Sequence, residues 1–123
     1  MEQINKGQDL FEQGNKAFLQ EENALAAALY QQVIQEGYQT YSIYHNLANA
    51  LELTEDISEA EDYHKKAMKR AETKEEKKDA LFSLGTFYYR NELMLKAEKI
   101  AKQAMDQHPE EYFGYQLMFF IGM

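Results

Sequence analysis

An internal repeat limits this chain to a small set of architectures. Small residues recur with one spacing, a step of twelve positions followed by a step of seven. Three sets share this spacing: Gly14, Ala26 and Val33; Ala48, Ala60 and Ala67; and Gly85, Ala97 and Ala104. The first members of these sets lie 34 and then 37 residues apart. A period of this length is typical of supersecondary units that stack on one another and bury a shared core.

The composition predicts that these units are helical. The 123 residues include a single Pro and six Gly, and the helix formers Ala, Glu, Lys, Gln and Leu are abundant. A glycine inside a helix costs about 1 kcal/mol relative to alanine, so the chain must need the missing side chain of Gly85. We expect the two helices of a unit to cross closely there, with Ala97 and Ala104 facing Gly85 from the second helix.

Further positions around the small residues resemble the tetratricopeptide repeat, whose loose signature is W-x2-L-G-x2-Y, then A-x3-F, then P. Tyr30 follows Ala26 by four residues, and Pro109 follows Ala104 by five. Apolar residues precede each small residue, in the pairs Leu10 with the weaker Gln13, Tyr44 with Leu47, and Leu81 with Leu84. The resemblance covers residues 7–111 and implies an all-α, right-handed solenoid of antiparallel helix pairs.

The register of the repeat divides the chain into five segments. They are a short polar leader (1–6), a first unit (7–40), a second unit with an extended charged connection (41–77), a third unit (78–111) and the apolar first helix of a partial fourth unit (112–123). The charged run 69–78 is interpreted as a solvated helix end, because its acidic and basic residues are spaced about four positions apart.

Charge and cysteine content exclude several classes of function. The chain carries 13 Lys and Arg against 21 Asp and Glu, a net charge of −8. Such a balance argues against nucleic acid and anionic lipid as partners, since both are bound through cations. Cysteine is absent, so no disulfide framework or thiol chemistry is expected. The N-terminal residues lack an apolar signal-peptide core, and we expect a cytoplasmic protein with no membrane contact.

Catalytic and metal-binding patterns are missing from the sequence. The three histidines, at positions 45, 64 and 108, are scattered. Glu61 lies one turn before His64, but a structural metal site needs three or four ligands. A phosphate-binding glycine-rich loop is absent, and so is an activated nucleophile beside a base. The sequence therefore predicts a protein that is not an enzyme, without catalytic residues, metal ligands or cofactors.

The resemblance implies a binding groove instead. In the tetratricopeptide family, the first helices of successive units line a concave groove that holds an extended peptide or a partner's helix. Registered to that pattern, this sequence places ten residues on the groove: Phe11, Asn15, Leu19, His45, Asn46, Asn49, Phe82, Thr86, Tyr89 and Arg90. The function expected from the resemblance is that of a non-catalytic protein–protein interaction scaffold.

One subgroup of the family binds the acidic C-terminal tails of heat-shock chaperones through a carboxylate clamp of two Asn and three cations. Asn15 and Asn46 match the clamp, but the three cation positions hold Phe11, Asp79 and Ser83. Because these residues cannot neutralise a carboxylate, we expect a neutral or basic apolar segment as the partner rather than an acidic chaperone tail. The two Asn amides could still contact a peptide main chain.

The last residues, "YFGYQLMFFIGM", depart from the amphipathic pattern. A solenoid usually ends in a helix with a polar outer face, whereas residues 112–123 offer little more than one Gln. Three interpretations remain open: a fragment of a longer array, such as a bacterial regulator that senses peptides; a homo-oligomer; or a membrane contact, for which the segment is short. The residues expected to mediate self-association are Tyr115, Met118, Phe119 and Phe120.

Overall fold

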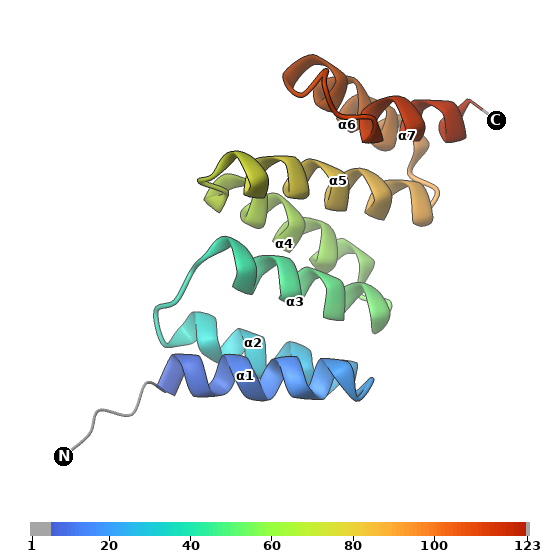
Figure 1. Ribbon diagram of the computed structural model, residues 1–123. Helices are drawn as coiled ribbons and strands as arrows, with labels where there is room; N and C mark the ends of the chain where they lie inside the picture. The colour runs from blue at the N-terminus through green and yellow to red at the C-terminus, as the bar shows by residue number, and fades with distance from the viewer. Residues whose placement is uncertain (1–5, 123) are drawn as a thin grey trace. The chain divides into compact units, whose positions relative to one another are not determined.

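The computed structural model describes residues 6–122, and this part of the chain forms seven α-helices and no strand (Figure 1). The helices are α1 (Lys6–Leu19), α2 (Asn23–Gln35), α3 (Tyr41–Leu53), α4 (Ile57–Arg70), α5 (Lys74–Arg90), α6 (Met94–Gln107) and α7 (Phe113–Ile121). The expected all-α fold is confirmed. Of the expected leader, residues 1–5 lie outside the described residues, and Lys6 already begins α1.

The chain forms two compact units, which divide after Arg70. In the first unit, α1 packs against α2, α2 against α3 and α3 against α4, and α1 also touches α3. In the second unit, α5 packs against α6, α6 against α7, and α7 also touches α5. Each unit thus brings together helices that alternate along the chain, α1 with α3 and α5 with α7.

The turns inside the helix pairs repeat one geometry. Glu21, Glu55 and Glu92 adopt left-handed backbone conformations, with φ of 62°, 66° and 60°. The amide of the next residue donates back into the preceding helix each time, over 2.9, 2.8 and 2.9 Å. This is the Schellman way of ending a helix, which satisfies carbonyls that the helix leaves unpaired. The three turns lie 34 and 37 residues apart, the same period as the small residues.

Gly85 makes room for large side chains, and these lie nearer to it than Ala97 and Ala104, the residues expected to face it. A Cβ atom added at Gly85 would lie 2.7 Å from Cδ2 of Leu117 and 3.2 Å from Cγ2 of Ile100. Gly14 plays the same part in the first unit, where an added Cβ would lie 2.7 Å from Cε1 of Tyr30. The glycines are needed because large apolar side chains of other helices fill the space beside them.

Helix α7 docks on α6 through a second glycine contact. A Cβ atom added at Gly114 would lie 3.0 Å from the carbonyl oxygen of Ala101 and 3.0 Å from the amide nitrogen of Met105. The backbones of α6 and α7 therefore approach closely at this point, and Leu117, one turn further along α7, is buried. This anchor sets which side of α7 faces α5. Within residues 6–122, no helix is both long and apolar enough to span a membrane.

Residues 69–78 contain the end of α4, a short connection and the start of α5. Helix α5 begins with a capping box, in which the Glu76 amide donates to the Thr73 hydroxyl over 3.0 Å and the Glu76 carboxylate accepts from the Thr73 amide. Lys78 forms ion pairs with Glu75 at 3.1 Å and Glu111 at 3.4 Å. Hydrogen bonding to Glu75 raises the pKa of the Lys78 ammonium above its ordinary value.

Gly85→Leu is expected to lower the free energy of unfolding by about 1–3 kcal/mol, because the new side chain competes with Ile100 and Leu117 for one space. Leucine is the better helix former, so a loss of stability must come from packing. Lys77→Leu, at an exposed position of the same helix, is the matched control. Urea unfolding followed by circular dichroism measures both. A Gly85→Leu chain as stable as the wild type would contradict this account of the glycine.

Candidate binding surfaces

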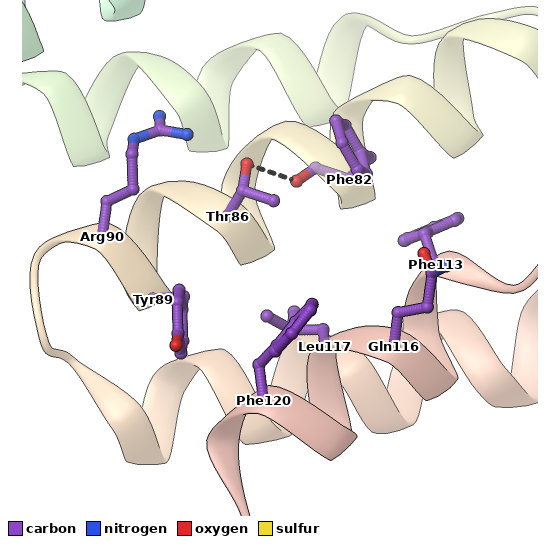
Figure 2. Close-up of a pocket in the computed structure, with 8 residues that line it drawn as sticks. All are labelled: Phe82, Thr86, Tyr89, Arg90, Phe113, Gln116, Leu117 and Phe120. Atoms are coloured by element: carbon purple, nitrogen blue, oxygen red, sulfur yellow. Dashed lines mark hydrogen bonds between the residues drawn. The ribbon is translucent and has the colours of Figure 1, made fainter. Parts of the chain in front are cut away.

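An aromatic pocket of about 270 Å³ opens between α5 and α7 (Figure 2). Phe82, Thr86 and Tyr89 approach it from α5, and Phe113, Gln116 and Phe120 approach it from α7. Leu117 lies between the two rows and is 6% exposed, so it forms the floor. Arg90 borders the pocket, and its side chain extends away from α7.

The rings of the aromatic pocket are held by contacts between the two helices. Phe82 and Phe113 meet edge to face, with ring centroids 5.7 Å apart, and the centroids of Tyr89 and Phe120 are 6.2 Å apart. The Thr86 hydroxyl donates to the Phe82 carbonyl over 2.8 Å, so its hydrogen is used inside the helix. The pocket presents ring faces and edges at a volume suited to one apolar side chain of a partner.

A second pocket, also of about 270 Å³, lies in the first unit. We call it the amide pocket, because three Asn side chains line it. Its lining residues are Asn15, Phe18, Leu19, Tyr30, Asn46 and Asn49. All six are uncharged, and they come from α1, α2 and α3. The surface can exchange hydrogen bonds with a ligand but offers no charge to balance an ionic group.

Tyr30 reaches from α2 to the amides of α1 and α3. Its ring is 1% exposed and lies against Phe11, with centroids 5.8 Å apart. The Tyr30 hydroxyl donates to Oδ1 of Asn15 over 2.6 Å, and Nδ2 of Asn46 donates to the same oxygen over 3.0 Å. Burial raises the pKa of the Tyr30 phenol above 10.0, although the hydrogen bond with Asn46 acts in the opposite direction. The phenol therefore stays protonated and able to donate at neutral pH.

The structure divides the ten predicted groove residues between the two units. Asn15, Leu19, Asn46 and Asn49 share the amide pocket, and Phe82, Thr86, Tyr89 and Arg90 share the aromatic pocket. The remaining two residues, Phe11 and His45, lie outside both.

Phe11 lines a separate hollow of about 200 Å³, which α1 forms with residues that include Val33 and Ile43. His45 stacks on Tyr41, with ring centroids 5.4 Å apart, and its Nε2 lies 3.2 Å from Nδ2 of Asn49. His45 therefore adjoins the amide pocket through Asn49 and belongs to the same polar surface.

The predicted self-association residues lie on two different sides of α7. Tyr115 is 45% exposed and Phe119 is 65% exposed, and helical spacing places Met118 beside them. With Tyr112, which is 79% exposed, they form what we call the outer face of α7. Phe120 points into the aromatic pocket instead (Figure 2). Residues 112–122 contain no charged side chain.

Metal-binding clusters are not found among residues 6–122, since no group of three or more His, Asp or Glu side chains comes together there. His64 is 2% exposed, and its ring lies edge-on to His45 at 6.4 Å. The clamp positions Phe11, Asp79 and Ser83 supply no cation.

Sequence reasoning missed four contributors to these pockets: Tyr30, Phe113, Gln116 and Leu117. Tyr30 carried a usable signal, because the repeat signature has Phe where this chain has Tyr. A buried hydroxyl usually has a hydrogen-bond partner, so the added oxygen pointed to a polar neighbour. The sequence around Phe113 and Gln116 carried no such signal, because the orientation of these residues depends on how α7 packs against α6 at Gly114.

Solved structures of tetratricopeptide-repeat domains share this fold. The TPR domain of Arabidopsis OM64 superposes with a TM-score of 0.76 at 19% identity, over 94% of this chain and 93% of that one. The first TPR of Spaghetti (RPAP3), bound to the HSP90 peptide SRMEEVD, gives 0.77 at 18% identity, over 98% and 93%. The second TPR domain of human RPAP3, in complex with the HSP70 peptide SGPTIEEVD, gives 0.77 at 16% identity, over 96% of each chain.

No protein-family model matches the sequence, and no curated protein is significantly similar to it. At identities below 20%, the structural likeness establishes the fold. The chain has the all-α, solenoid-type fold of tetratricopeptide-repeat domains, as the internal repeat predicted.

The raised pKa of Tyr30 predicts a stability effect at high pH. The folded chain binds the phenolic proton more tightly than the unfolded chain does. This contribution to stability is therefore complete below pH about 10 and is lost as pH rises through the raised pKa. We expect the wild type to lose more stability than Tyr30→Phe between pH 9 and 11, measured by urea unfolding. Equal losses in the two chains would show that the Tyr30 proton is not held by the fold.

Proposed function

We propose that this chain is a non-catalytic protein-interaction module that binds a segment of another protein, with the aromatic pocket receiving an apolar side chain. The observation that carries the proposal is the pocket itself: four rings around the buried Leu117, in a fold whose solved examples include peptide complexes. Moving one apolar side chain from water into such a site contributes about 1.5–3 kcal/mol. The ten predicted groove residues remain the proposed contacts.

The four segments 7–40, 41–77, 78–111 and 112–123 are kept as the proposed repeat units. The three left-handed turns, 34 and 37 residues apart, support this division. An acidic chain that folds as an interaction domain fits a cytoplasmic protein that binds neither nucleic acid nor membrane.

The proposed partner segment is apolar and neutral or basic. The RPAP3 domains are bound to acidic peptides that end in EEVD. In this chain, the positions that would carry clamp cations hold Phe11, Asp79 and Ser83, and the amide pocket is uncharged. A carboxylate tail would lose its hydration there without gaining an ion pair.

The proposal predicts that capped heptapeptides selected from a display library against residues 1–123 share an apolar side chain at one position. Phe120→Ala and Phe82→Ala are expected to weaken binding of a selected peptide at least about tenfold, since each removes one wall of the pocket. Isothermal titration calorimetry measures the affinities. Phe119→Ala is the matched control, because Phe119 is the neighbouring exposed ring outside the pocket.

Two results would contradict this function. One is a library that yields no saturable binder, and the other is binding that Phe120→Ala and Phe82→Ala leave unchanged. The peptide SRMEEVD is the comparison ligand, and tighter binding of SRMEEVD than of the selected peptides would refute the proposed partner chemistry.

Self-association through the outer face of α7 is a second candidate, favoured by the exposure of uncharged aromatic residues. Tyr112, Tyr115 and Phe119 are 79%, 45% and 65% exposed. At roughly 200 Å² per aromatic side chain, they offer roughly 400 Å² in each copy. Two copies would bury roughly 800 Å², below the roughly 1,000 Å² of a stable specific interface, so the dimer would form only at high concentration.

Phe119→Glu is expected to abolish this association while preserving helicity, because it places a charge at the centre of the contact. Light scattering coupled to size exclusion, over a hundredfold range of concentration, measures the mass. Leu95→Glu, at an exposed position on α6, is the control. A wild-type chain that is monomeric at the highest concentration would remove this candidate.

A further inference from the structure

We infer that the amide pocket recognises a neutral peptide group rather than a carboxylate, and that the Tyr30 hydroxyl sets this preference by fixing the orientation of the Asn15 and Asn46 amides. The inference deepens the proposed function and rests on it, since it names the ligand chemistry of the first unit. Tyr30 is a positioning residue in this account.

The orientation follows from the hydrogen bonds of one oxygen atom. Oδ1 of Asn15 accepts from the Tyr30 hydroxyl at 2.6 Å and from Nδ2 of Asn46 at 3.0 Å. An amide oxygen has two lone pairs, so both are used. Asn15 therefore turns its Nδ2 group, with two N–H donors, toward a ligand. Asn46 has its Nδ2 directed at Asn15, which leaves Oδ1 as the end that a ligand meets.

The pair thus presents one donor and one acceptor side by side. A peptide group carries the complementary pair, a C=O to accept from Asn15 and an N–H to donate to Asn46. A carboxylate only accepts, so it would satisfy Asn15 and face the Asn46 oxygen with no hydrogen between them. The uncharged lining of the pocket gives a carboxylate no compensation.

Gly14 is what allows Tyr30 to reach this position. The Tyr30 ring lies so close to α1 that a Cβ atom at Gly14 would be 2.7 Å from it. Asn15 is the next residue along α1, so the hydroxyl at the far end of the ring meets the Asn15 amide. Phe11 supports the ring from one turn earlier in α1, at a centroid distance of 5.8 Å. Phe18 and Leu19, which also line the pocket, offer apolar contact beside the amides.

The test uses two small probes that differ only in the group of interest. N,4-dimethylpentanamide carries one N-methylamide group, and 4-methylpentanoate carries one carboxylate in its place. Each is titrated into the ¹⁵N-labelled chain, and the side-chain amide signals of Asn15 and Asn46 are followed by NMR. We expect the N-methylamide to shift these signals saturably and to bind at least about threefold more tightly than the carboxylate.

Three variants separate positioning from folding. Tyr30→Phe keeps the ring but frees the Asn15 amide to turn, so it should weaken N-methylamide binding about three- to tenfold and reduce the preference over the carboxylate. Asn15→Asp still accepts from Tyr30 but has no donor, so it should abolish binding of both probes. Tyr44→Phe removes the hydroxyl of another buried tyrosine in the same unit and should change neither affinity nor preference.

The inference is overturned if the carboxylate binds as well as the N-methylamide, if neither probe shifts the Asn15 and Asn46 signals, or if Tyr30→Phe keeps the full preference. The proposed function fails by a different result, a display library without binders that depend on the aromatic pocket. Binding of selected peptides that is sensitive to Phe120→Ala and indifferent to Tyr30→Phe would keep that function and remove this inference.

Discussion

The contact between a glycine and a large side chain of another helix is the constraint on which both candidate surfaces depend. Gly14 lets the Tyr30 ring lie against α1, which brings the hydroxyl to the amides of Asn15 and Asn46. Gly85 admits Ile100 and Leu117 beside α5, which places the floor of the aromatic pocket. In each unit, a missing side chain on a first helix shapes the candidate surface.

Both pockets have few charged side chains, unlike the rest of this acidic chain. The chain carries a net charge of −8, yet the amide pocket is lined by uncharged residues and the aromatic pocket chiefly by rings. Burial of apolar surface would supply the affinity in the aromatic pocket, while oriented amides would supply selectivity in the other. The negative net charge of the chain would favour partners with basic flanks.

The sequence predicted the fold because the repeat is encoded in local spacing. Three features reflect helix geometry: the steps between small residues, the single Pro and the abundance of helix formers. Each of them can be recognised in a single sequence, without an alignment of relatives. The partners of Gly85 could not be predicted, because Ala97 and Ile100 lie on one helix within a turn of each other and spacing alone does not say which faces α5. The position of Phe120 was missed for a similar reason, since the close approach at Gly114 fixes the rotation of α7.

The most direct measurement of the central claim is the map of ¹⁵N and aromatic ¹³C shift changes when a selected capped heptapeptide is titrated into residues 1–123. We expect the changes to gather on Phe82, Tyr89 and Phe120, which line the aromatic pocket, and the signals of Tyr112 and Tyr115 to stay unshifted. Changes confined to the outer face of α7, or to α2, α4 and α6, would contradict the account.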